Sequence, residues 1–243
     1  MGLAGTTGTG ARIAAANVPA DYRNVTLEDS PARESQAAIY AKLADYVTTF
    51  ERQFDEDYAV AGPDKRIKSL YLYSEEPGTG KTTTAVSLLH RWITQHYIGS
   101  LQRGLTPLQR PGYMLDLNEW QTQFNLAVMT NDDDDMQDFK RKMKIAMEVP
   151  FLVLDDVGVR EITPKFRGYV HAIVNHRVSN ALTTVYTSNI PIKYSGKKNQ
   201  ALISQGEVYD LIDVFGEKRL ADRIGDLTMT LSFGGTSKRG TRR

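Results

Sequence analysis

The stretch SEEPGTGKTT at residues 74–83 is the part of the sequence that decides the fold. An apolar segment at residues 68–74 precedes it and predicts a strand, and apolar positions at helical spacing over residues 82–97 predict a helix after it. Glycines let several backbone N–H groups point inward, and a lysine and a helix N-terminus add positive potential. The stretch therefore predicts a phosphate-binding loop of the Walker A type between a strand and a helix.

Each side chain of this loop has an expected partner. Lys81 is expected to reach the β- and γ-phosphates of ATP, and the Thr82 hydroxyl to complete the shell of Mg²⁺. Glu75 stands where the general pattern has its first glycine, a position that accepts a side chain if its φ is negative. The residues expected to bind the nucleotide are Glu76, Pro77, Gly78, Thr79, Gly80, Lys81, Thr82 and Thr83.

A second apolar stretch, PFLVLDD at residues 150–156, ends in two carboxylates. In an open α/β sheet, ligands bind at the carboxyl ends of the strands, so the stretch predicts a Walker B strand. We expect Asp155 to hold Mg²⁺, directly or through water, and Asp156 to polarise the attacking water. A buried strand that simply ends in a turn is the alternative.

The remaining pattern alternates between strands and helices. Strands are expected at residues 113–116, 183–188 and 228–233, and helices at 35–54, 118–129, 136–148, 164–179 and 208–224. Such alternation predicts an α/β fold with a five-stranded parallel sheet flanked by helices. We expect residues 1–54 to form a flexible N-terminal arm plus one helix. Residues 55–243 are expected to form the ATPase core, with a short basic C-terminal tail and no C-terminal helical lid domain.

Composition limits the partners and the location. Lys and Arg number 30 against 29 Asp and Glu, for a net charge of +1, so no global field draws the chain to nucleic acid. Any DNA contact must come from a local patch or an assembled ring. There is no cysteine, which excludes disulfides and cysteine-based zinc sites. No apolar run approaches the roughly 20 residues that span a bilayer, so we expect no membrane partner and a cytoplasmic location.

Four further stretches carry a family resemblance. They are DDVG at residues 155–158, IVNHR at 173–177, TSN at 187–189 and FGEKRLADRI at 215–224. With the two motifs above, they resemble the DnaC/DnaI family of bacterial helicase loaders, which are P-loop ATPases of the AAA+ type. The resemblance spans roughly residues 18–239. Transposition helper ATPases of the IstB type share the same core, so the partner stays open between a replicative helicase and a transposase.

The resemblance implies that ATP binds between neighbouring subunits of a ring or spiral. Asn189 matches the sensor 1 residue, which contacts the γ-phosphate and the lytic water, although a simple turn cap is the alternative. Arg223 matches the arginine finger and Arg219 is the second candidate, against a solvated helix face for both. Arg239 resembles the terminal sensor 2 arginine. Asp156 replaces the usual glutamate, so hydrolysis is expected to be slow and stimulated by assembly.

The front of the chain departs from the family. Only the first 68 residues, counted to Lys68, lie ahead of the Walker A strand, where loaders usually carry a separate helicase-binding domain. The absence of cysteine rules out the zinc-binding version of that domain found in DnaI. Either the arm and helix before Phe54 contact the helicase, or the partner is a different protein.

Two groups of basic residues are candidates for DNA contact. Lys140, Arg141, Lys142 and Lys144 lie where loaders contact single-stranded DNA, and a charged face balanced by the acidic run 132–135 explains them equally well. Lys193, Lys197 and Lys198 form a second basic loop with no assigned role.

These features predict a helicase loader for DNA replication, of bacterial or phage origin, that uses ATP and Mg²⁺. It is expected to contact single-stranded DNA and the replicative helicase. The alternatives are an IstB-like transposition helper, and a small-molecule kinase for which the sequence offers no evident acceptor site.

Overall fold

The computed structural model describes residues 2–3, 11–56, 58, 62, 65–158, 162–199, 203 and 207–237. Within them, five parallel strands form one sheet in the order β2-β3-β4-β1-β5. The strands are β1 (Ser69–Tyr73), β2 (Gly112–Asp116), β3 (Phe151–Asp155), β4 (Thr183–Ser188) and β5 (Thr228–Ser232). The predicted five-stranded parallel sheet is confirmed.

The central strands are buried on both faces. Because successive side chains of a strand point to opposite sides, Leu70 and Leu72 enter one hydrophobic cluster while Tyr71 enters the other. In β3, Val153 joins the first cluster, and Leu152 and Leu154 join the second. A strand that faces two cores reads as a continuous apolar run, which is the pattern that the sequence shows.

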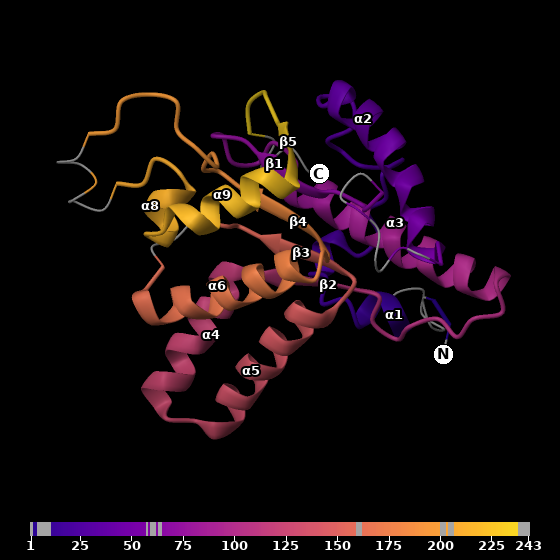
Figure 1. Cartoon of the computed structure of the whole chain (residues 1–243), viewed down its shortest axis with the longest axis horizontal. Coiled ribbons are helices and arrows are strands. Elements are labelled where there is room, and N and C mark those ends of the chain that lie inside the picture. Colours follow the sequence, from indigo (N-terminus) through magenta and orange to yellow (C-terminus); the bar gives the residue numbers. More distant parts are fainter. Residues whose placement is uncertain are drawn as a thin grey trace.

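Helices cover both faces of the sheet (Figure 1). The first face is covered by α2 (Ala37–Thr48), the 3-10 helix η2 (Thr49–Phe54) and α3 (Lys81–Gln102). The second face is covered by α4 (Leu117–Thr130), α5 (Asp133–Glu148), α6 (Pro164–Ser179), α8 (Leu211–Phe215) and α9 (Lys218–Leu227). No helix in the described ranges combines the length and the apolar character needed to cross a membrane.

The last predicted helix is divided in two. Gly216 has a φ of 62°, in the left-handed region that ends helices and that glycine adopts readily, and it separates α8 from α9. A side chain at this position would also collide with Arg167, because an added Cβ would lie 2.4 Å from its Nη1. The break allows α8 and α9 to pack on each other and on the second face.

The N-terminal segment packs against the rest of the chain from residue 11 onward. It contains α1 (Ala11–Ala14) and the 3-10 helix η1 (Ala20–Tyr22). Arg12 is 3% exposed, and its Nε donates to Leu108 O at 2.7 Å. The backbone N–H of Met114 on the edge strand β2 donates to Ala16 O at 2.8 Å, so this segment covers a sheet edge.

The predicted domain boundary at residue 54 does not coincide with a gap in the core. Leu43 and Phe50 lie in the same hydrophobic cluster as Leu70 and Val153 of the sheet. The helix ahead of residue 55 therefore shares the hydrophobic core of the sheet.

Candidate nucleotide-binding site

The loop at residues 74–80 joins β1 to α3 and has the backbone geometry of a phosphate-binding turn. Gly78 and Gly80 have φ values of 75° and 102°, which side chains other than glycine rarely adopt. A Cβ on Gly80 would lie only 2.4 Å from the Cβ of Ala32, which packs over the turn. Glycine is thus required at position 80 both by the backbone and by the neighbouring segment.

Glu75 meets the condition under which its position accepts a side chain. It is not among the described residues with positive φ, so the turn does not need glycine there. The phenol of Tyr73 donates to its Oε1 at 3.1 Å and holds the carboxylate beside the strand.

Lys81 is the first residue of α3 and is only 5% exposed. Its Nζ donates to Glu76 O at 3.2 Å and to Ser74 O at 3.5 Å, so the ammonium lies among the carbonyl groups of the loop. Phosphate oxygens make shorter and stronger charge-assisted hydrogen bonds than neutral carbonyls do. The lysine is therefore already placed beneath the loop, where a phosphate would replace these weak contacts.

Asp155 lies at the end of β3, directly opposite the start of α3. The Thr82 hydroxyl donates to its Oδ1 at 3.1 Å, and the Thr187 hydroxyl donates to the same oxygen at 2.5 Å. Burial, and then the nearby Asp156, raise the pKa of Asp155 to about 7, although the hydroxyl groups of Thr187 and Thr82 favour the charged form. A cation at this position would favour the ionised carboxylate.

The residues present fit a magnesium ion. Carboxylate oxygens of Asp116, Asp155 and Asp156 lie within 4.8 Å of one another, and the Thr82 hydroxyl adjoins them. Mg²⁺ prefers such oxygen ligands and usually keeps several waters. Asp116 was not predicted, although it ends β2 and pairs in register with Asp155, so a polar residue at the end of the neighbouring strand was the available signal.

Asp156 has an unusual backbone conformation and a specific partner. Its φ is 57°, its N–H donates to Thr187 Oγ1 at 3.0 Å, and Asn118 Nδ2 donates to its Oδ2 at 3.3 Å. A non-glycine residue in the left-handed region carries strain, which surrounding contacts must hold in place. Asn118, two residues beyond β2, is a further site residue that the sequence did not reveal.

Asn189 follows β4 and reaches the entrance of the loop. Its Nδ2 donates to Ser74 O at 2.9 Å and to Glu75 O at 3.0 Å. The carboxyl ends of β1, β3 and β4 therefore lie side by side, with Lys81, Asp155 and Asn189 around them.

Gln36 links the loop to the end of the sheet. Its Nε2 donates to Gly234 O at 2.7 Å and to Thr79 O at 3.4 Å. The segment after β5 thus begins beside the phosphate loop. Arg239, predicted in the following tail, lies outside the described residues.

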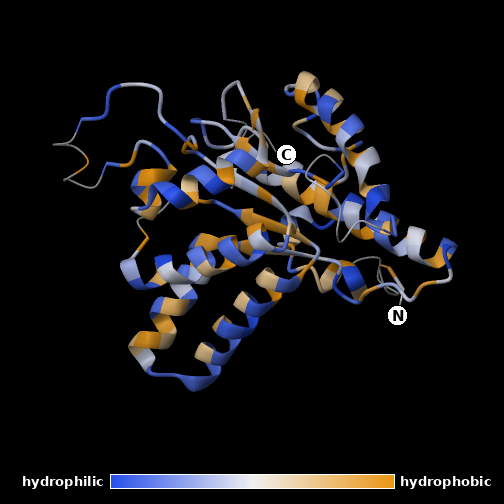
Figure 2. Cartoon of the chain, viewed as in Figure 1, coloured by the Kyte–Doolittle hydropathy of each residue, from blue (hydrophilic) through white to orange (hydrophobic). Residues whose placement is uncertain are grey.

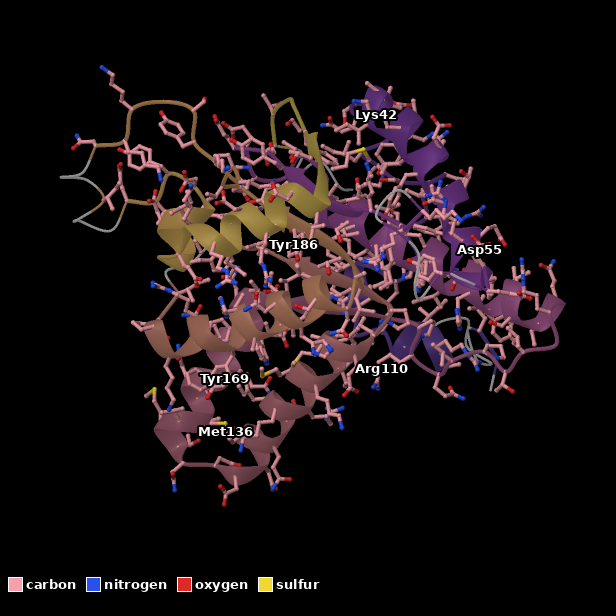
Figure 3. The ribbon with its side chains drawn as sticks, in the orientation of Figure 1. Lys42, Asp55, Arg110, Met136, Tyr169 and Tyr186 are labelled. Carbon is pink, nitrogen blue, oxygen red and sulfur yellow. The ribbon has the colours of Figure 1, made fainter. Side chains whose placement is uncertain are left out.

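Arg223 lies away from the phosphate loop, at the opposite end of the sheet. It is half-buried on α9 and lines a cavity of about 530 Å³ together with the first residues of β1, β4 and β5. Tyr186 of β4, labelled in Figure 3, lines the same cavity. Since a five-residue strand spans about 17 Å, this amino end of the sheet is well separated from the phosphate loop. Arg219 is exposed on the same helix.

The basic residues of α5 are largely paired within their own helix, which Figure 2 shows as mostly hydrophilic. Arg141 bonds to Asp138, Lys142 Nζ lies 3.4 Å from the same carboxylate, and Lys144 Nζ lies 4.0 Å from Glu148. Lys140 is exposed. Within the acidic run, Asp132 caps the helix, accepting from Asp134 N and Asp135 N.

The second basic loop is also paired. Lys193 Nζ lies 2.9 Å from Asp222, and Lys198 Nζ lies 2.7 Å from Asp210 and 2.9 Å from Asp213. Lys197 is exposed.

The parallel sheet, the phosphate loop after β1 and the carboxylates at the end of β3 are the elements of a P-loop fold. No family model matches the sequence, and no curated protein matches it.

Solved structures do match. The DnaC helicase loader is similar over 89% of this chain and 100% of its own, with 21% identity and a TM-score of 0.55. DnaI is similar over 92% of this chain and 95% of its own, with 19% identity and a TM-score of 0.55. The replication initiator DnaA bound to AMPPCP and single-stranded DNA is similar over 90% and 51%, with 13% identity and a TM-score of 0.52. The chain has a DnaC/DnaI-like AAA+ fold.

Proposed function

We propose that this chain is an ATPase that loads a replicative DNA helicase during the initiation of DNA replication. The observation that carries the proposal is that Lys81, Asp155 and Asn189 lie together at the carboxyl ends of the strands. The fold that holds them resembles DnaC over the whole length of that protein. The similar structures also include an initiator bound to a nucleotide analogue and single-stranded DNA, which supports a role in the same process.

In the proposed reaction, the N–H groups of the loop and Lys81 hold the phosphates of ATP. Thr82 and Asp155 would hold Mg²⁺, which neutralises phosphate charge when it is bound. Asp156 accepts a hydrogen bond from water and orients it toward the γ-phosphorus. The new P–O bond forms as the bond to the β–γ bridging oxygen breaks, releasing ADP and inorganic phosphate.

Hydrolysis is proposed to need a second subunit. Arg223 faces the amino end of the sheet, away from the phosphate loop of its own chain, so a neighbouring copy is the place where it can meet a nucleotide. An arginine supplied in this way is worth about 10³ to 10⁵ in rate, so a dilute monomer should hydrolyse ATP slowly.

Contact with single-stranded DNA is proposed to involve the basic residues of α5. Lys140 is exposed on α5, while Arg141 and Lys142 share Asp138 as a partner. Phosphates would have to compete with that carboxylate. Binding through these residues should therefore be weak in a single subunit and strengthen only when several subunits line one strand.

The test is capture of partners from the native host on immobilised protein, with ATP and without it. The proposal predicts ATP-dependent recovery of the cognate replicative helicase, and the Lys81→Ala variant, which cannot hold the phosphates, serves as the matched control. Absence of the helicase under all conditions would reject loading. Capture of a transposase, together with preference for duplex over single-stranded DNA, would instead select the transposition helper.

A further inference from the structure

A chain of side-chain contacts joins α6 to α9 beside the cavity at the amino end of the sheet. Arg223 Nη1 donates to Asn175 Oδ1 at 2.5 Å. Asn175 Nδ2 lies 3.1 Å from His171 Nδ1 and 3.2 Å from its Nε2, and His171 Nε2 lies 3.2 Å from Glu217 Oε2. Among the described residues, Asn175 is the hydrogen-bond partner of Arg223, and IVNHR is a stretch that the ATPase site itself does not use.

The hydrogen-bond donors and acceptors along this series of contacts are compatible with one another. The Asn175 carbonyl oxygen must face Arg223, because a guanidinium only donates, so its amide N–H is turned toward His171. His171 can accept at Nδ1 while its Nε2–H donates to Glu217. The amide of Asn175 therefore has one orientation that satisfies all its neighbours, and this orientation is the one that holds Arg223.

We infer that Asn175 is a positioning residue for Arg223, holding its guanidinium ready for the nucleotide of a neighbouring subunit. The inference rests on the proposed function. Arginine has a long side chain whose rotamers are costly to fix, and a bond to one of its five N–H groups fixes it before the neighbour arrives. A neutral amide leaves the positive charge intact for phosphate, whereas a carboxylate at the same place would neutralise it.

The cavity beside Arg223 explains why its guanidinium must be held in place. Arg223 borders a cavity of about 530 Å³, which gives a released side chain room to turn inward. Asp226 lines the same cavity and carries the opposite charge. Without Asn175, the guanidinium can turn toward this exposed carboxylate of its own subunit, and fewer copies would present it to the adjoining subunit.

The experiment measures ATP hydrolysis in mixed assemblies. Wild-type subunits supply the active sites, and an excess of Lys81→Ala subunits supplies only the arginine. Donors that also carry Asn175→Ala should stimulate hydrolysis about tenfold less than donors with Asn175, since a hydrogen bond to a charged group is worth about that factor. Donors with Asn175→Asp, which have nearly the same shape, should also stimulate less because the carboxylate cancels the charge.

The controls separate positioning from a general structural effect. Asn180→Ala makes the same change at the end of α6, where Asn180 Nδ2 donates to His176 O, and it should leave stimulation unchanged. Melting temperatures and ATP affinity of the otherwise wild-type Asn175 variants should equal those of the unmodified protein. Combining Asn175→Ala with Arg223→Ala in a donor should reduce stimulation no further than Arg223→Ala alone.

Two failures can be told apart. If Arg223→Ala donors stimulate as well as intact donors, the arginine does not act across subunits and that part of the proposed function fails. If Arg223→Ala donors do not stimulate hydrolysis while the Asn175 variants stimulate it fully, the positioning role alone is overturned. The same holds if adding Asn175→Ala to Arg223→Ala lowers stimulation further than Arg223→Ala does alone.

Discussion

Replacing Asp155 by asparagine should make the nucleotide-free protein more stable while it removes a proposed ligand for Mg²⁺. Asparagine has nearly the same shape and keeps an Oδ1 that can accept from both Thr82 and Thr187, as the carboxylate does. What it removes is a buried negative charge that lies beside Asp156 and Asp116. The substitution therefore separates the loss of folding stability caused by the buried charge from the proposed binding of Mg²⁺.

The pKa of Asp155 gives the magnitude. Burial and neighbouring carboxylates raise the pKa from 3.8 to about 7. Below pH 3.8 the group is protonated in both folded and unfolded chains and costs nothing; stability is then lost as the pH rises toward 7, because only the unfolded chain ionises freely. At about 1.4 kcal/mol per pH unit, the cost is roughly 4 kcal/mol at pH 8 and roughly 2 kcal/mol at pH 5.

The assay is chemical denaturation of both proteins in EDTA, without nucleotide, at pH 5 and pH 8. The variant should gain stability at both values and gain more at pH 8. Asp210→Asn is the control of opposite sign, because Lys198 and backbone N–H groups lower the pKa of Asp210, so neutralising it should destabilise the protein. An Asp155→Asn variant no more stable than the wild type at pH 8 would refute the reasoning.

Three other substitutions test the site and its frame. Asp156→Asn should bind ATP normally and lower turnover at least about 100-fold in a steady-state phosphate-release assay, and unchanged turnover would remove Asp156 from its role. Gly80→Ala should lower the free energy of unfolding in urea by about 1–3 kcal/mol and weaken ATP binding, because its φ is 102° and the new Cβ would lie 2.4 Å from Ala32. A variant as stable as the wild type would contradict this geometry. Arg177→Leu should cost about 2–4 kcal/mol in the same assay, because this 1%-exposed side chain donates to backbone carbonyls at the end of α5, and no loss would show those bonds to be dispensable.

The parts of the fold that sequence predicts well are those with a local physical signal. β3 lies within the stretch 150–156 that predicts it, because it is an uninterrupted apolar run. The predicted bounds of α6 agree with the structure, because α6 begins with Pro164 after Thr163. Thr163 Oγ1 accepts from Phe166 N, and proline is favoured in the first turn of a helix.

Contacts between distant segments were harder to predict. Asn118 and Asp116 carry no motif, and they reach the site only because β2 lies beside β3 in register. The packing of residues 11–20 combines buried Ala16 and Val18 with a buried arginine and backbone hydrogen bonds to distant segments. These few apolar residues do not form a periodic pattern that would predict the packing. For Arg223, sequence indicated a role but gave no sign of its contact with Asn175.

The central claim is that the loop after β1 binds the phosphates of a nucleotide, and isothermal titration calorimetry with ATP and ADP tests it most directly. In the presence of Mg²⁺, the wild-type protein should bind both nucleotides with one site per chain, and Lys81→Ala should lose most of that affinity while it keeps the wild-type circular dichroism spectrum. Folded wild-type protein that takes up neither nucleotide would contradict the claim, as would a Lys81→Ala variant that binds as tightly as the wild type.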